Sequence, residues 1–198
     1  MPATGKHRSI DTRKKGAEGR LRWTVHGRRD VYASDWMRVS LDDVEIPGGD
    51  RFEHHVVHFP RASVTAVVTD DADQVLLLWR HRFIPDTWGW EIPAGWAEPG
   101  EDTTAAIRRE IEEETGYRPG TVRPMTAYNA LSGISDMRFT AFLASDAEFV
   151  GPPTDHSESS RVEWVPLAAV PELAAHGQIQ DGPSLAALTY YLAVERPS

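Results

Sequence analysis

Short apolar runs alternate with turn-forming residues along the first third of the chain. β-branched and aromatic residues are concentrated in three runs, LRWTVHGRRDVY, WMRVSLDDVEI and FEHHVVHF, and the turn sequence Pro47-Gly48-Gly49-Asp50 separates the last two. Runs of this length between Gly, Pro and Asp are typical of antiparallel strands. The pattern therefore predicts a small antiparallel β-sheet over residues 21–60.

The pattern becomes more apolar after residue 60. Two runs, SVTAVVTD and QVLLLWRHRF, lie on either side of a turn at residues 70–73. Both are rich in Val and Leu, which favours strands in the core over strands on the surface. We therefore predict a buried hairpin here.

A helical pattern occupies residues 101–115. Helix formers fill this stretch, an apolar stripe is supplied by Ala105, Ala106, Ile107 and Ile111, and Gly116 stands where a left-handed cap ends a helix. Later patterns predict strands at 122–130, 137–144 and 161–165, and helices at 167–176 and 184–194. We expect three parts: a disordered basic tail at 1–20, an N-terminal β subdomain at 21–60 and the main domain at 61–198.

Composition narrows the class of protein. The 198 residues include no cysteine, which excludes disulfides, thiol catalysis and thiolate metal sites. The net charge is -9, and the first 20 residues contain six Lys or Arg against two acidic residues, so the remaining chain is strongly acidic. An acidic body argues against nucleic acid as the main partner. No apolar run approaches the roughly 20 residues that cross a bilayer, so we expect no membrane contact and a cytoplasmic location.

Carboxylates gather on one face of the expected helix. Glu110, Glu113 and Glu114 are three and four positions apart and share a face, whereas Glu112 points elsewhere. Their repulsion is relieved when a hard divalent cation such as Mg²⁺ binds carboxylate oxygens. The alternative is a solvated acidic face balanced by neighbouring arginines.

The spacing around these carboxylates favours the metal site. Five residues separate Gly95 from Glu101, seven more precede Arg109-Glu110-Ile111, and Glu113-Glu114 and Gly116 follow at intervals of one residue. This pattern resembles the signature of the Nudix hydrolases. The resemblance implies an α/β fold, an α/β/α sandwich with a mixed sheet, and attack by water on a phosphorus of a nucleoside diphosphate linked to a second group.

The resemblance also implies roles for residues of the box. Glu110 and Glu114 would bind Mg²⁺, or Mn²⁺ in its place, together with the backbone carbonyl of Ala94, and Glu113 would serve a second ion.

Three further residues of the box would support these ligands. Arg109 is expected to act in catalysis by fixing the carboxylates, with Glu101 as a second support, and Gly95 would let the backbone approach ion and phosphate closely.

The flanking segments resemble the ADP-ribose pyrophosphatase branch of the family. LLLWRHRFIPDTWGWEIPAGW precedes the helix, and SGISDMRFTAFLA and GQIQDGPSLAALTYYL follow it. The likeness assigns Arg82, Glu91 and Gly133 to substrate binding, although Arg82 could equally form a surface salt bridge. Ser132 stands where the branch usually has proline, which leaves another nucleoside diphosphate sugar open as substrate.

Further roles come from the same likeness. Trp36 and Phe52 lie near where related enzymes stack aromatics on adenine, and packing in the small sheet is an equal alternative. The apolar residues and the exposed edge of that sheet need cover, which predicts a homodimer. The general base is assigned to Glu158, with Asp155 and His156 as rivals.

A cluster of histidines and a cluster of tryptophans are assigned structural roles and not roles in binding metal or substrate. His54 and His58 share one strand face while His55 takes the other, so these three histidines are not expected to bind metal. The tryptophans beside the catalytic loop are assigned to packing; they are Trp88, Trp90 and Trp96.

Together these patterns predict a Mg²⁺-dependent pyrophosphohydrolase that cleaves ADP-ribose or a related nucleotide sugar to a nucleoside monophosphate and a sugar phosphate. One alternative is hydrolysis of oxidised nucleoside triphosphates or dinucleoside polyphosphates by the same residues. Another is a non-catalytic module that senses a nucleotide, although such modules typically lose box carboxylates that this chain retains.

Overall fold

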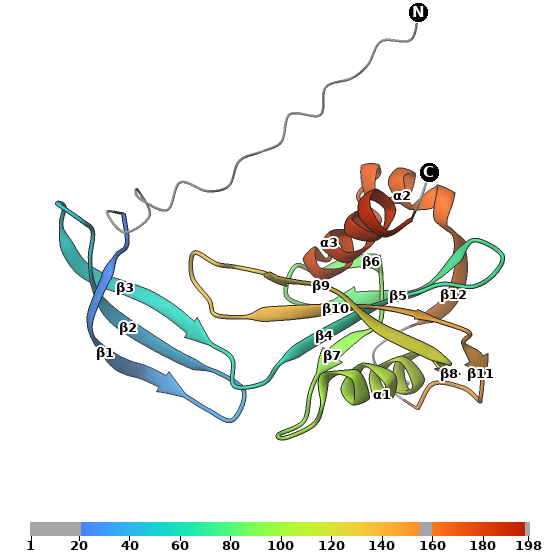
Figure 1. Cartoon of the computed structure of the whole chain (residues 1–198), viewed down its shortest axis with the longest axis horizontal. Coiled ribbons are helices and arrows are strands. Elements are labelled where there is room, and N and C mark those ends of the chain that lie inside the picture. Colours follow the sequence, from blue (N-terminus) through green and yellow to red (C-terminus); the bar gives the residue numbers. More distant parts are fainter. Residues whose placement is uncertain (1–20, 155–159, 197–198) are drawn as a thin grey trace, which may run out of the picture. The chain divides into compact units, whose positions relative to one another are not determined.

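A computed structural model describes residues 21–154 and 160–196 of the chain. These residues form two compact units, one ending at Val57 and the other beginning at His58 (Figure 1). The basic tail at 1–20 and the three candidates for the general base, Asp155, His156 and Glu158, lie outside the described residues.

The first unit is a three-stranded sheet in the order β1-β2-β3, formed by Thr24–Ala33, Arg38–Glu45 and Arg51–His58. β1 runs antiparallel to β2, which confirms the small antiparallel sheet predicted from the sequence. Every residue of β1 is exposed. Trp23 and Phe52 meet edge to face with their ring centroids 5.8 Å apart.

The second unit contains a four-stranded mixed sheet. Its order is β7-β4-β10-β9, formed by Ala94–Trp96, Ser63–Val68, Arg138–Ser145 and Thr121–Asn129. β4 is parallel to β10 and antiparallel to β7, while β10 is antiparallel to β9. The mixed sheet that the family resemblance implies is therefore confirmed.

A second sheet in this unit has the order β12-β5-β6, formed by Arg161–Pro166, Gln74–Arg82 and Thr87–Glu91. β5 is antiparallel to both neighbours. A short antiparallel pair joins β8 (Tyr117–Arg118) to β11 (Glu148–Phe149).

The predicted hairpin of residues 63–83 is wrong in its pairing. The turn forms, with the Asp70 N–H donating to the Gln74 carbonyl at 3.2 Å, but β4 and β5 then separate into different sheets. Beside the turn, an isolated β-bridge pairs Thr69 with Val75. All six residues of β4 are buried, so an apolar run of this kind shows burial without showing which strand is its neighbour.

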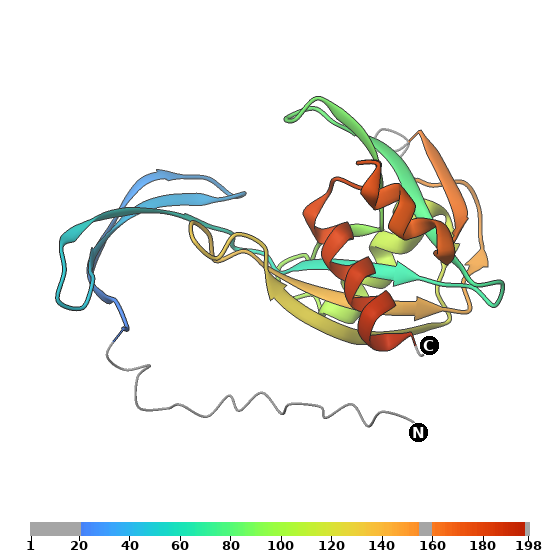
Figure 2. The same ribbon diagram turned by 90° about the horizontal axis from the view of Figure 1, so that it is seen from above.

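Alternate residues of the central strands face two helical layers (Figures 1 and 2). Val64 and Ala66 of β4 pack in one cluster with Ile107 of α1 (Thr103–Thr115). Val67 faces the opposite cluster, which includes Leu188 of α3 (Gly182–Tyr190).

The remaining helical turns belong to the second of these layers. They are η2 (Leu167–Ala169), α2 (Val170–Ala175) and η3 (Tyr191–Glu195). The α/β/α sandwich is confirmed. None of the described helices is both long enough and apolar enough to pass through a lipid bilayer.

α1 begins two residues later than its sequence pattern suggests. Asp102 is its N-cap, and the carboxylate of that residue accepts hydrogen bonds from the N–H groups of Thr104 and Ala105 at 2.9 and 3.2 Å. An N-cap lies outside the helix, so Glu101 belongs to the preceding loop. Gly116 ends the helix at φ 75° and ψ 11°, as predicted.

Candidate active site

One guanidinium group organises the acidic face of α1. Nη1 of Arg109 donates to Oε1 of Glu110 at 2.9 Å and to Oε2 of Glu113 at 3.0 Å. Nη2 donates to Oε2 of Glu101 and to the Trp96 carbonyl, both at 3.0 Å. The hydrogen bond to Glu101 is the main cause of a raised pKa for Arg109. Arg109 therefore holds three carboxylates, those of Glu101, Glu110 and Glu113.

Glu101 connects the loop before the helix to this centre. It accepts from Arg109, and its Oε2 also accepts from the Glu98 N–H at 2.8 Å. The Arg109 hydrogen bond and then the Glu98 hydrogen bond lower the pKa of Glu101, so this carboxyl is an anion at neutral pH.

Glu114 is buried and is held by Arg80, a residue that the sequence analysis did not single out. Nη2 of Arg80 donates to its Oε1 at 2.7 Å, and the Ala94 N–H donates to its Oε2 at 3.0 Å. Only 4% of Glu114 is exposed. Burial raises its pKa to about 7, against the opposing effect of Arg80. A charged residue within the apolar run of β5 was the available signal for Arg80, since a buried charge needs a partner.

Gly95 brings the backbone of β7 against Glu110. A Cβ at Gly95 would lie 2.1 Å from the carboxyl carbon of Glu110, closer than any ordinary contact, so a larger residue cannot keep this arrangement. Burial raises the pKa of Glu110, and the hydrogen bond from Arg109 opposes that effect.

The donor set suits a cation that takes oxygen ligands. Within the described part of the chain, no three His, Cys, Asp or Glu side chains are gathered into a metal-binding group, and Arg109 and Arg80 form ion pairs with the box carboxylates Glu110 and Glu114. Mg²⁺ does not need a group of three protein side chains, since it usually binds one or two carboxylates, several waters and substrate phosphates. The carboxylate cluster and the space that Gly95 leaves beside Glu110 fit that demand.

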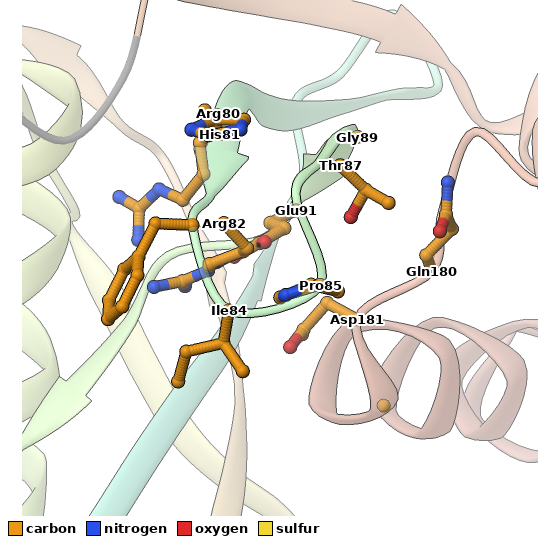
Figure 3. Close-up of a pocket in the computed structure, with 12 residues that line it drawn as sticks. Arg80, His81, Arg82, Ile84, Pro85, Thr87, Gly89, Glu91, Gln180 and Asp181 are labelled. Carbon is orange, nitrogen blue, oxygen red and sulfur yellow. Dashed lines mark hydrogen bonds and ion pairs between the residues drawn. The ribbon is translucent and has the colours of Figure 1, made fainter.

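Arg82 and Glu91 form an ion pair beside a large pocket (Figure 3). Nε of Arg82 donates to Oε1 of Glu91 at 2.9 Å, and Nη2 donates to Oε2 at 2.5 Å. Glu91 is buried, whereas 47% of the Arg82 side chain is exposed. The pocket has a volume of about 670 Å³, and Arg82 and Glu91, two of the residues predicted to bind substrate, line it.

The other candidates lie elsewhere. Gly133 is in the loop between β9 and β10 and does not line this pocket. Trp36 and Phe52 belong to the first unit and are exposed.

The tryptophans near the catalytic loop make ring contacts. Trp90 is buried, and Trp79 packs against it edge to face at 5.1 Å. Trp88 is half-exposed and stacks on Trp79 at 6.3 Å, while Trp96 meets Phe59 at 5.5 Å.

His58 pairs with a loop residue of its own unit. Its Nδ1 lies 2.6 Å from Oδ2 of Asp136, and Oδ1 of Asp136 accepts from the Phe59 N–H at 3.0 Å. The pair fixes the loop that contains Gly133 to the start of this unit.

Comparison with known proteins identifies the class that this fold and site define. The NUDIX domain profile matches residues 59–188, and the profile of the nucleoside diphosphate sugar hydrolase N-terminal domain matches residues 23–57. The chain belongs to the Nudix family and is a hydrolase.

Individual relatives extend this result. The chain is 42% identical over 158 residues to a CMP-5'-(N-acetyl-N-hydroxy-3-aminopropyl)phosphonate hydrolase of Streptomyces rubellomurinus, covering 80% of this chain and 76% of that protein. It is 27% identical to the ADP-ribose pyrophosphatase of Bacillus subtilis over 82% of this chain and 89% of the relative. The crystal structure of an ADP compounds hydrolase superposes with a TM-score of 0.76 at 20% identity, covering 86% of this chain and 92% of the other, which shows the shared fold.

Proposed function

We propose that the protein is a Mg²⁺-dependent pyrophosphohydrolase that cleaves ADP-ribose or a related nucleoside diphosphate sugar. The products are a nucleoside monophosphate and a sugar phosphate. One observation carries the proposal: Glu110, Glu113 and Glu114 lie on one side of α1, with Arg109 and Arg80 fixing their positions. ADP-ribose pyrophosphatases among the relatives support the substrate class.

In this proposal Glu110, Glu113, Glu114 and the Ala94 carbonyl hold the metal. When bound, Mg²⁺ polarises the phosphoanhydride and neutralises charge on the phosphates. Mn²⁺, which also accepts oxygen ligands, is an alternative. Arg82 is exposed and fixed by Glu91, so it can bind a substrate phosphate with little loss of side-chain freedom.

The chemistry is a displacement at phosphorus. The oxygen of a water molecule bonds to one phosphorus, its proton passes to a general base, and the bond from that phosphorus to the bridging oxygen breaks. We assign the base to Glu158, with Asp155 and His156 as alternatives. Backbone hydrogen bonds fix the described residues on either side of this segment. The Thr154 N–H donates to the Glu113 carbonyl at 3.0 Å, and the Ser160 N–H donates to the Trp79 carbonyl at 2.9 Å.

A second substrate class is favoured by a specific observation. The relative that hydrolyses a CMP-linked phosphonate is 42% identical to this chain, well above the 27% and 29% of the ADP-ribose pyrophosphatases. Ser132 in place of the usual proline also separates this chain from the ADP-ribose branch. Such a substrate would contain a comparable P–O–P bond, between a phosphate and a phosphonate, and the phosphonate would be the leaving group.

The N-terminal sheet completes the proposal. We infer that it forms a homodimer, which would cover the exposed apolar residues of β1, and that Trp36 and Phe52 contact the nucleotide. A cysteine-free chain that acts on intracellular nucleotides fits the cytoplasm.

The test is a substrate panel with purified protein and Mg²⁺. It should include ADP-ribose, other nucleotide sugars, a CMP-linked phosphonate, nucleoside triphosphates and dinucleoside polyphosphates, with products identified by ³¹P NMR. Nucleoside monophosphate plus a second phosphorylated product supports the proposal. Pyrophosphate release would favour the triphosphate alternative, and tight nucleotide binding without turnover of any compound would contradict a hydrolytic role.

A matched variant connects turnover to the box. Glu114→Gln keeps the shape of the side chain and removes its charge, so Mg²⁺-dependent turnover should fall by about 100-fold or more if this carboxylate serves the metal. Circular dichroism confirms that the variant is folded, and Glu112→Gln on another face of α1 is the control. Unchanged turnover in Glu114→Gln would contradict the assigned role.

A further inference from the structure

The short connection between β6 and β7 joins two different sheets. β6 ends at Glu91 in the sheet β12-β5-β6, and β7 begins at Ala94 in the sheet β7-β4-β10-β9. Glu91 fixes Arg82, to which the proposed function assigns a substrate phosphate (Figure 3), and Ala94 supplies the carbonyl assigned to the metal. The placement of the phosphate-binding arginine relative to the metal site therefore depends on the two connecting residues, Ile92 and Pro93.

Hydrogen bonds from two neighbouring elements hold this connection. The Ile92 N–H donates to Oγ of Ser184 in α3 at 3.2 Å. The Pro93 carbonyl accepts from the hydroxyl of Thr65 at 3.0 Å and from the Ala66 N–H at 2.9 Å, both in β4. Proline has no backbone N–H, so Ile92 supplies the one N–H of the two-residue connection, and Ser184 accepts it.

Ser184 is held in the orientation that this contact needs. Its hydroxyl donates to Oδ2 of Asp181 at 2.7 Å, and its N–H donates to the same oxygen at 2.8 Å. A hydroxyl has one proton and two lone pairs, so the proton directed at Asp181 leaves lone pairs for the Ile92 N–H. Ser184 and Ile92 are both fully buried. Removal of the hydroxyl would therefore take an acceptor from a buried N–H, which is costly.

The start of α3 is packed closely against the end of β6. The Trp90 N–H donates to the Gln178 carbonyl at 2.7 Å. Gly89 permits this approach, because an added Cβ there would lie only 3.2 Å from the same carbonyl oxygen. Ile92 and Leu188 of α3 belong to one buried apolar cluster. The helix is thus a firm support for the connection that follows β6.

From these contacts we propose that Ser184 is a positioning residue for hydrolysis. By holding the Ile92 peptide, it aligns the phosphate bound at Arg82 with the metal site at Ala94. The inference rests on the proposed function. Ser184 does not itself line the pocket, so it acts through the backbone and not by contact with the substrate.

Strand pairing indicates which step should depend on Ser184. Glu91 lies opposite Leu78 in one sheet, and Ala94 lies opposite Thr65 in the other, so each end of the connection is also held by its own ladder. Loss of the Ser184 hydroxyl should therefore disturb the alignment of the two ends more than either end alone. A purely structural role in α3 is the alternative, and it would lower stability without changing this alignment.

Kinetics separate the two roles. In Ser184→Ala, kcat on the best substrate of the panel should fall by about tenfold or more while KM changes by less than about twofold, because misalignment is felt mainly in the transition state. Ser184→Thr keeps the hydroxyl and should recover most of kcat. Ser63→Ala is the matched control. Ser63 is also buried, and within the described residues its hydroxyl has no hydrogen-bond partner.

The second anchor gives an independent variant. Thr65→Val keeps the shape of the side chain and removes the hydroxyl that donates to the Pro93 carbonyl. The Ala66 N–H still holds that carbonyl, so the same change in kcat without KM should appear at about threefold. This variant carries the test if Ser184→Ala does not fold.

Metal binding tests the alignment without turnover. Mn²⁺ binding to the full chain is measured by electron paramagnetic resonance, with and without α,β-methylene-ADP and corrected for Mn²⁺ bound by the free analogue. In the unmodified protein the analogue should tighten Mn²⁺ binding by about tenfold, because its phosphates contact Arg82 and the ion together. In Ser184→Ala, Mn²⁺ alone should bind as before, and the tightening should fall to about threefold or less.

The outcomes distinguish this inference from the proposed function. If a substrate is hydrolysed but Ser184→Ala keeps the full kcat or the full tightening, the positioning role fails and the hydrolase stands. If no compound is hydrolysed but Ser184→Ala loses the tightening, the positioning role stands and the hydrolytic proposal fails. No tightening by the analogue in the unmodified protein would overturn the inference.

Discussion

Replacing Gly95 by alanine would place a methyl group inside the space now filled by the Glu110 carboxylate. The added Cβ would lie 2.1 Å from Cδ of Glu110 and 2.3 and 2.4 Å from its oxygens. An ordinary contact begins near 3.4 Å, so the carboxylate must move by about 1.3 Å. The obstacle is the end of a flexible side chain, and Gly95 has no positive φ, so β7 can accept the alanine backbone.

The Gly95→Ala variant should therefore fold and lose activity. A displacement of about 1 Å at a catalytic group can cost about 100-fold in rate, which corresponds to about 2.7 kcal/mol of transition-state stabilisation. The free energy of unfolding should change by less than about 1 kcal/mol, as for other alanines at compatible glycines.

Two measurements made together test this prediction. Urea unfolding gives the stability, and kcat/KM on the best substrate of the panel gives the rate. Gly27→Ala is the control, because an added Cβ there meets no atom within 4 Å. Full activity in Gly95→Ala would refute the assigned role of Glu110, and loss of folding would show that the Glu110 side chain cannot move aside.

Three further predictions follow from the same contacts. Arg80→Met leaves the buried carboxylate of Glu114 without its ion pair and should lower the free energy of unfolding by about 3–5 kcal/mol, measured by urea denaturation. The double variant Arg80→Met with Glu114→Met should recover most of that loss. No recovery in the double variant would contradict the pairing. Asp136→Asn should reduce stability at neutral pH. Partial burial raises the pKa of Asp136, but the hydrogen bonds from His58 and from the Phe59 N–H outweigh that effect, so the pKa in the folded protein is lowered. The stabilisation is therefore present above the unfolded pKa of about 3.9 and is lost as the pH falls through the lower pKa of the folded protein. Denaturation of the two proteins between pH 2 and 7 should converge at the acid end, and a constant difference would exclude this ionic origin. Light scattering should give twice the 22.1 kDa mass of one chain, whereas the monomer mass at micromolar concentration would contradict the homodimer.

Local signals allowed much of the second unit to be predicted from the sequence. The carboxylate face of α1 depends on spacings of three and four residues, and the end of the helix depends on Gly116 alone. Both are fixed within a few residues of chain, so no distant contact alters them. The start of the helix was misplaced because Asp102, and not an earlier residue, supplies the capping oxygen.

Long-range contacts could not be predicted in the same way. Arg80 is 34 positions from Glu114, and the sequence shows a charge inside an apolar strand without showing its partner. The separation of β4 from β5 was missed because both strands are buried on both faces, so their apolar residues fit several pairings equally well. The pocket wall at Gln180 and Asp181 is brought to Arg82 by the packing of α3 against the sheets, which no local pattern encodes.

The two arginines of β5 contact different parts of the site, and this difference matters for protein engineering. Arg80 contacts the helix that carries the box, whereas Arg82 stands at the mouth of the pocket, and both project from one rigid strand. Residues 83–86 and 180–181 belong to connecting segments at the pocket that do not contribute to the carboxylate cluster. A library that randomises these segments and leaves β5 intact is therefore the practical route to new substrate preferences in this scaffold.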